Sequence, residues 1–128
     1  MILLDTHVWV RWLVAEDVGI QVANLIEDSY EVAVSSISCW EVTYLAKRGR
    51  LTLPFHPEKW IKIGLHDARI YSLPIDRHIA ILSASLPDHH RDPADRIIIA
   101  TAVHYGAQLI SFDEKFRKYK ELDGLLVW

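Results

Sequence analysis

Short apolar runs alternate with longer amphipathic segments from one end of the 128-residue sequence to the other. The segments repeat their apolar residues at helical spacing, as Val8, Trp9, Trp12 and Leu13 do. The apolar runs are predicted as strands at residues 1–4, 31–35, 70–73, 108–112 and 125–128. Strands that alternate with helices are typical of βαβ units, in which parallel strands form one sheet with helices on both faces. The sequence therefore predicts an α/β fold.

Helices are expected between these strands, at residues 8–13, 20–29, 38–47, 57–66, 76–86 and 93–104, with a basic helix before the last strand. The length is that of one domain and no Pro/Gly-rich linker divides it, so residues 1–128 are expected to form a single domain. Cys39 is the only cysteine, which excludes an internal disulfide and a cysteine-based zinc site and fits a cytoplasmic protein. Neither a basic leader nor an apolar run of ~18 residues is present, so no membrane contact is expected.

Acidic residues follow the strands at the places where a parallel sheet carries its ligand sites. Asp5 and Asp113 each come directly after an apolar run, and Glu41 lies one turn into the helix after the second run. Asp95 lies in the first turn of the most apolar helix, and Asp92 stands just before that helix. Because ligands bind beyond the carboxyl ends of parallel strands, these side chains are expected to meet at one edge of the sheet.

Each carboxylate also has a structural explanation. Ser38 and Glu41 have the spacing of a capping box, and Asp92, before a proline, is a good helix N-cap. Asp5 and Asp113 could cap the helices that follow them. For each residue taken alone, a helix cap and a functional carboxylate both remain possible. Taken together, the acidic residues predict a cluster of carboxylates in one pocket.

Such a cluster favours a bound cation. Carboxylates placed close together raise one another's pKa and oppose ionisation. Oxygen ligands suit hard cations such as Mg²⁺ and Mn²⁺ rather than zinc. A metal of this kind lowers the pKa of a bound water and neutralises charge on a phosphate during in-line attack, so the chemistry predicted is phosphodiester hydrolysis. The net charge of −3 does not exclude a nucleic-acid substrate, because two divalent ions would reverse its sign.

Four segments, in order and spacing, resemble the PIN-domain ribonucleases, and among them the VapC-type toxins of toxin–antitoxin pairs. They read LDTH at 4–7, SCWE at 38–41, HRDPADRII at 90–98 and LISFD at 109–113. The third segment is the most specific, and the resemblance spans essentially the whole chain.

The resemblance implies a three-layer α/β/α fold with a five-stranded parallel sheet, and a metal-dependent endoribonuclease that uses Mg²⁺ or Mn²⁺. The catalytic and metal-binding positions of the family carry over onto Asp5, Glu41, Asp95 and Asp113. Thr6 matches a position that often carries a hydroxyl in the family, and Asp92 belongs to the variant motif of one subgroup. Both are additional candidates.

Basic and imidazole side chains near this cluster have weaker interpretations. Arg91 and Arg96 flank the expected pocket, and contact with a substrate phosphate is about as well supported as a surface salt bridge. The seven histidines include the pair His89 and His90, but no established spacing such as HExxH is present. A histidine metal site is therefore not expected.

Three other functions fit parts of the pattern. A housekeeping PIN-type RNA-processing nuclease would use the same site, although the small single domain favours the toxin. A phosphotransferase with Asp5 as nucleophile would want a second Asp where this chain has His7. A non-enzymatic, magnesium-binding receiver-like interaction domain would want a Lys after its fifth strand, where this chain has Leu-Leu-Val-Trp at 125–128.

The resemblance also implies partners: an RNA substrate, a small cognate antitoxin protein and a second copy of the chain in a homodimer. The sequence does not identify the RNA. Exposed carboxylates can receive the forked guanidinium of an arginine, and a flexible antitoxin tail would order on binding. Such a partner is expected to cover the helices near Trp9, Trp12 and Tyr44 and to direct an Arg or Lys at the carboxylates.

Overall fold

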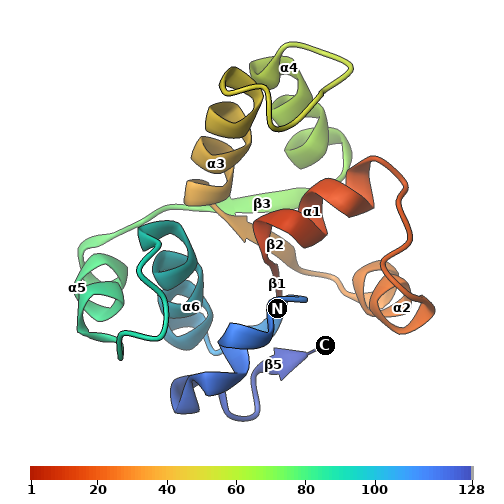
Figure 1. The fold of residues 1–128 in the computed structure, drawn as a ribbon. Coiled ribbons are helices and arrows are strands. Elements are labelled where there is room, and N and C mark those ends of the chain that lie inside the picture. Colours follow the sequence, from red (N-terminus) through yellow and green to blue (C-terminus); the bar gives the residue numbers. More distant parts are fainter. Residues whose placement is uncertain (128) are drawn as a thin grey trace.

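A computed structural model describes residues 1–127, which contain a five-stranded, fully parallel sheet with strand order β3-β2-β1-β4-β5 (Figure 1). The strands are β1 (Ile2–Leu4), β2 (Val32–Ser35), β3 (Ile70–Leu73), β4 (Gln108–Ile110) and β5 (Leu126–Val127). The predicted α/β fold with five parallel strands is confirmed. Trp128, which was expected at the end of the last strand, lies outside the described residues.

Helices connect these strands close to the predicted positions. They are α1 (Thr6–Leu13), α2 (Ile20–Asp28), α3 (Ser36–Lys47), α4 (Pro57–Lys62), the π-helix η1 (Ile63–Asp67), α5 (Arg77–Ser85), α6 (Pro93–Tyr105) and the 3-10 helices η2 (Glu114–Lys118) and η3 (Lys120–Leu122). The basic helix expected before the last strand is therefore a pair of 3-10 helices. Its buried residues Phe116, Tyr119 and Leu122 recur every three residues, which suits the three-residue turn of a 3-10 helix rather than an α-helix.

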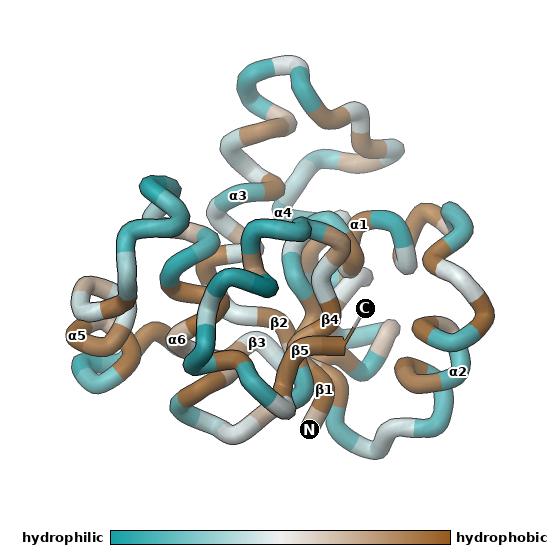
Figure 2. Tube along the Cα trace, turned by 60° about the horizontal axis from the view of Figure 1, so that its bottom comes forward, coloured by the Kyte–Doolittle hydropathy of each residue, from teal (hydrophilic) through white to brown (hydrophobic). Residues whose placement is uncertain are grey.

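The sheet separates two apolar cores, because successive side chains of each strand point to opposite faces. In β1, Ile2 and Leu4 belong to one core and Leu3 to the other. The first core is covered by α1, α2, α3 and α4, and the second by α5, α6, η2 and η3. Figure 2 shows the apolar strands gathered at the centre of the molecule, with hydrophilic segments outside. This arrangement is the three-layer α/β/α architecture that the sequence predicted.

Trp9 fills the first core. Its side chain is fully buried, its ring lies 5.3 Å from that of Trp60, and its Nε1 donates a hydrogen bond to the Gly64 carbonyl at 3.2 Å. A Cβ at Gly64 would overlap Leu13 Cδ1 unless that side chain shifted, and it would lie 3.3 Å from Trp9 Cζ2, so glycine allows this close approach of η1 to α1 without rearrangement. The expectation that Trp9 faces a partner is wrong, because this position of α1 points into the core. Trp12 is only partly buried.

The carboxyl end of β1 lies at the point where the strand order reverses. β2 and β3 extend the sheet on one side of β1, and β4 and β5 extend it on the other. Leu4 is in register with Ile110, and the Asp5 N–H donates to the Ile110 carbonyl at 3.0 Å. The residues that follow β1 and β4 are thereby held next to each other, at the switch point where open α/β sheets bind ligands.

None of the helices formed by residues 1–127 is long and apolar enough to cross a membrane.

Candidate active site

Asp5 is the most deeply buried carboxylate of the cluster, with 4% of its surface exposed. It caps α1, since its Oδ1 accepts a hydrogen bond from the Thr6 N–H at 2.8 Å, and its Oδ2 accepts one from the Ser111 hydroxyl at 2.8 Å. Burial raises the pKa of Asp5 above its usual value, although the Ser111 hydrogen bond works in the opposite direction. Asp5 is therefore both a helix cap and a carboxyl group held in place within the cluster.

Thr6 links α1 to Glu41 on α3. The Thr6 hydroxyl donates to Glu41 Oε1 at 2.6 Å and lies 2.7 Å from the Ser38 hydroxyl. Because Thr6 has a single hydroxyl proton and an ionised Glu41 can only accept, the proton between the two hydroxyls comes from Ser38. Burial raises the pKa of Glu41, and the nearby charges of Asp5 and Asp92 raise it further.

The capping-box interpretation of Ser38 and Glu41 is wrong. α3 begins two residues earlier, with Ser35 as its N-cap accepting a hydrogen bond from the Ile37 N–H at 3.2 Å. Ser38 is thus inside the helix, buried, and turned towards Thr6. The early start leaves the Glu41 side chain available to the carboxylate cluster.

Asp95 experiences the charges of all its acidic neighbours. It lies in the first turn of α6, which is capped by Asp92 through a 3.0 Å hydrogen bond from the Ala94 N–H to Asp92 Oδ1. Burial, followed by the charges of Asp5, Asp92, Glu41 and Asp113, raises the pKa of Asp95 to about 7. These four acidic side chains are therefore near enough to Asp95 for their charges to act on it.

Asp113 is in hydrogen-bond contact with a histidine that was not expected in the site from the sequence. His90 Nε2 lies 3.2 Å from Asp113 Oδ2 and 3.9 Å from Asp95 Oδ2. The Tyr119 hydroxyl accepts from the His90 backbone N–H at 2.9 Å and lies 3.1 Å from His90 Nδ1. Since that hydroxyl can donate its own proton to Nδ1, Nε2 carries the ring proton and donates it to Asp113.

One potential ligand atom from each of His90, Asp95 and Asp113 can be chosen so that the three lie within 4.8 Å of one another. His90 is buried, its ring stacked on Tyr119 and edge-on to Phe116. His90 is thus the one histidine of residues 1–127 that lies in such a group, although no histidine metal site was expected from the sequence. Its position next to the HRDPADRII segment was a signal, but its contact with Asp113, 23 residues away, had no signature in the sequence.

Asp113 has a lower pKa than the other carboxylates. Partial burial acts to raise it, but the Lys115 N–H, His90 and the Lys115 charge together bring the pKa below its usual value. The Lys115 N–H donates to Asp113 Oδ1 at 2.9 Å, so Asp113 also caps η2. The cluster thus combines one readily ionised carboxylate with others, such as Asp95, that ionise reluctantly.

Arg96 binds backbone carbonyls. Its guanidinium nitrogens donate to the Asp88 carboxylate and to the carbonyl oxygens of Ser83, Ala84, Leu86, Pro87 and His90, at 2.7–3.4 Å. These bonds tie the end of α5 and the loop after it to α6, and they place the His90 backbone. The arrangement favours a structural role for Arg96 over contact with a phosphate. Arg91, by contrast, is exposed.

Ser111 is a further residue that sequence reasoning missed. Its hydroxyl donates to Asp5 Oδ2 and accepts from the Asp113 N–H at 3.1 Å, so it joins two carboxylates. A serine directly after an apolar strand, two residues before a predicted ligand, was the available signal.

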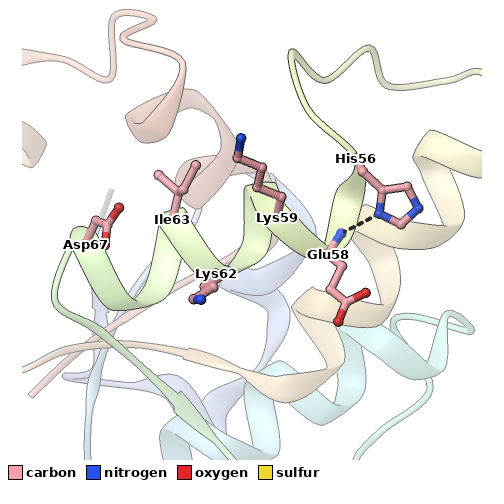
Figure 3. A pocket seen from close by; sticks show the side chains of 6 residues that line it. All are labelled: His56, Glu58, Lys59, Lys62, Ile63 and Asp67. Carbon is pink, nitrogen blue, oxygen red and sulfur yellow. Dashed lines mark hydrogen bonds between the residues drawn. The ribbon is translucent and has the colours of Figure 1, made fainter.

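A separate groove, with a volume of about 740 Å³, runs along α4 and η1 (Figure 3). It is lined by His56, Glu58, Lys59, Lys62, Ile63 and Asp67. His56 caps α4 here by accepting a hydrogen bond from the Glu58 N–H at 3.3 Å. The charges in this groove are of both signs and belong to one solvated helix face, so we assign the chemistry to the carboxylate cluster instead.

The donor set of the cluster fits a hard divalent cation. Asp5, Glu41, Asp95 and Asp113 offer carboxylate oxygens at one edge of the sheet, and burial opposes the ionisation of three of them. A divalent ion would reverse this effect, because it favours the charged form of each carboxylate.

The sequence profile of the PIN domain family matches residues 2–122. The chain is 32% identical to Ribonuclease VapC22 of Mycobacterium tuberculosis (strain ATCC 25618 / H37Rv) over 130 aligned residues, which cover 99% of this chain and 98% of that protein. Both matches extend over nearly the whole sequence.

Solved structures share the fold. VapBC2 from Rickettsia felis, bound to a DNA fragment from its promoter, superimposes with a TM-score of 0.76 at 19% identity, covering 100% of this chain and 99% of that one. A toxin–antitoxin complex from Klebsiella pneumoniae gives 0.65 at 23% identity, with coverages of 100% and 97%. FitAB bound to an IR36 DNA fragment gives 0.67 at 19% identity, with coverages of 99% and 94%. The family profile and the full-length relative together establish that the chain belongs to the PIN domain family.

Proposed function

We propose that the chain is a metal-dependent endoribonuclease whose catalytic and metal-binding residues are Asp5, Glu41, Asp95 and Asp113, with Mg²⁺ or Mn²⁺ as the ion. The observation that carries this proposal is the gathering of carboxylates at the switch point of the sheet, where Asp5, Glu41 and Asp113 lie near enough to Asp95 for their charges to act on it. The 32% identical relative is named a ribonuclease, which supports RNA as the substrate.

The chain's own residues supply the positioning. Asp5 is fixed by the Thr6 N–H and the Ser111 hydroxyl, and Thr6 in turn holds Glu41. His90 orients Asp113. When bound, a divalent ion stabilises charge on the scissile phosphate and lowers the pKa of an attacking water. Arg91 is a candidate for phosphate contact on the rim, and Asp92 serves first as the cap of α6.

RNA cleavage is expected to disappear completely in EDTA and to return with Mg²⁺ or Mn²⁺. Without the ion, the carboxylates neither lower the pKa of an attacking water nor neutralise charge on the phosphate. The measurement is incubation of the purified chain with total cellular RNA, followed by mapping of the new ends. Zinc is expected to restore less activity than Mg²⁺. Full cleavage in chelator would refute the mechanism.

We further propose that the chain acts as the toxin of a toxin–antitoxin pair, working in the cytoplasm as a single domain over residues 1–128 and as a homodimer. Two of its structural neighbours are a VapBC assembly and a toxin–antitoxin complex, which supports this reading. A housekeeping RNA-processing nuclease is the alternative, and it would have the same active site.

A small protein encoded next to this chain is expected to co-purify with it and to suppress RNA cleavage. Trp9 is buried, so the apolar contacts of such a partner would involve half-buried residues of α1 such as Trp12. Co-expression followed by a pull-down and a cleavage assay tests the expectation. If the neighbouring protein neither binds nor inhibits, the toxin role fails while the nuclease role remains.

A further inference from the structure

Two aromatic side chains stack on the solvent-exposed side of α3. The rings of Trp40 and Tyr44 lie 4.9 Å apart at an interplanar angle of 11°, and 56% of Trp40 and 38% of Tyr44 are exposed. The guanidinium carbon of Arg48 lies 5.1 Å from the centre of the Tyr44 ring. Trp40, Tyr44 and Arg48 therefore form an ordered stack, called here the α3 stack, in which Trp40 is the most exposed aromatic ring.

The α3 stack begins beside the carboxylate cluster. Residues three, four and seven positions apart share one face of a helix, so Glu41, Tyr44 and Arg48 lie along one stripe of α3. Glu41 is bonded to Thr6 within the cluster, and Trp40 is its immediate neighbour in the chain. At a rise of 1.5 Å per residue, Arg48 lies about 10 Å beyond Glu41 along the helix axis. A ligand held at the carboxylates would extend naturally onto this stripe.

We propose that the α3 stack is a base-stacking subsite for an unpaired nucleobase of the RNA strand whose phosphate lies at the carboxylate cluster. This inference rests on the proposed nuclease function. Tyr44 occupies one face of the Trp40 ring, and a base can stack on the exposed surface of the pair, as bases do on the aromatic platforms of single-strand binding proteins. Bases inside an A-form duplex are stacked on one another, so the subsite selects single-stranded RNA such as a loop.

The charges around the α3 stack favour RNA over a protein surface as its occupant. Arg48 belongs to a basic group with Lys47 and Arg50 at the end of α3, and these residues are exposed. Cationic groups beside aromatic rings match the two parts of a nucleotide, a polyanionic backbone and a flat base. The same helix carries Glu41, so one element positions both the reacting phosphate and the adjoining base.

Binding of RNA to Trp40 variants tests the inference. The variants are made in an Asp95→Asn background, which is expected to prevent cleavage, and the dissociation constant is measured by anisotropy with labelled single-stranded RNA in Mg²⁺. Trp40→Ala is expected to weaken binding about tenfold, while Trp40→Phe keeps most of the affinity. Tyr71→Ala is the matched control, because Tyr71 is an equally exposed aromatic on β3, and it should leave affinity unchanged.

A second measurement distinguishes base stacking on Trp40 from a general loss of RNA affinity. A set of RNAs is used, each lacking the base at one position. The protein with Trp40 is expected to bind less tightly to the RNA whose missing base lies at one particular position near the cleavage site. The Trp40→Ala protein is expected to bind that RNA as tightly as the intact RNA. Unchanged affinity of Trp40→Ala would overturn the inference. A second result would also overturn it. If sedimentation shows that Trp40→Ala loses its oligomeric state or its protein partner while its RNA affinity is unchanged, the stack is a protein interface. Failure of the wild-type protein to cut RNA would instead refute the proposed function, and it is scored separately on a gel.

Discussion

Replacing Asp95 with Asn is expected to abolish RNA cleavage and, in metal-free buffer at pH 8, to raise the free energy of unfolding by up to about 4 kcal/mol. The pKa of Asp95 is raised to about 7 from an ordinary value of 3.8, and each pKa unit corresponds to about 1.4 kcal/mol. Asn keeps the shape of the side chain and removes both the charge and a metal ligand. Stability and activity therefore move in opposite directions.

The sign of the pH dependence follows from the raised pKa. Below about pH 4, Asp95 is protonated in the folded and the unfolded protein, and its charge has no effect on stability. Between about pH 4 and 7 the unfolded chain releases this proton while the folded protein retains it, so stability falls as pH rises. The advantage of Asp95→Asn should grow across this window and level off above pH 7.

Urea unfolding of both proteins between pH 4 and 8, in EDTA and in Mg²⁺, measures this effect. Mg²⁺ binds only the folded wild type and should reduce or reverse the difference. Asp92→Asn is the matched control, because Asn also caps helices well and Asp92 is exposed. It should retain substantial cleavage. If the difference in stability between Asp95→Asn and the wild type does not vary with pH, the pKa of Asp95 is not raised in the folded protein. If Asp92→Asn loses cleavage completely, Asp92 is a metal ligand too.

Replacing Arg96 with Met is expected to lower the free energy of unfolding by about 3 kcal/mol or more. Met retains much of the apolar stem but leaves five carbonyl oxygens without the guanidinium that now binds them. In a chain of this length the loss should lower the melting temperature by about 10 °C. Calorimetry measures the shift directly.

Arg91→Met is the comparison for Arg96. Arg91 is exposed, so its replacement should change stability by less than about 0.5 kcal/mol. If Arg91 contacts a phosphate, its loss should reduce the slope of RNA affinity against salt concentration by about one. A melting temperature for Arg96→Met equal to that of the wild type would show that the carbonyl contacts contribute little.

Features that depend on the spacing of apolar residues and on the order of elements along the chain could be predicted from the sequence. Asp5 and Asp113 follow apolar runs, and the parallel sheet brings the ends of β1 and β4 together. The cap at Asp92 was also predicted, because capping is local and depends on a few adjacent residues. Such features need no knowledge of distant contacts.

Features that depend on tertiary contact could not be predicted. The bonds from His90 to Asp113 and from Ser111 to Asp5 join positions 23 and 106 residues apart, and neither pair has a characteristic spacing. Arg96 binds backbone carbonyls, which every residue possesses and no sequence motif marks. Trp9 was assigned to a partner surface because helical periodicity shows that a face is apolar but not whether the fold covers it.

The hydrogen bond between Ser111 and Asp5 also has a consequence for synthesis. The pairing of β1 with β4 brings together residues from nearly opposite ends of the sequence, and contacts of such long range form late in folding. A nascent chain whose residues 108–113 are still inside the ribosome has neither the neighbour of β1 nor Asp113 in place. Its carboxylates cannot assemble until residues 108–113 have left the ribosome. The proposed nuclease can therefore act on RNA only after the residues up to Asp113 have been translated and folded onto β1.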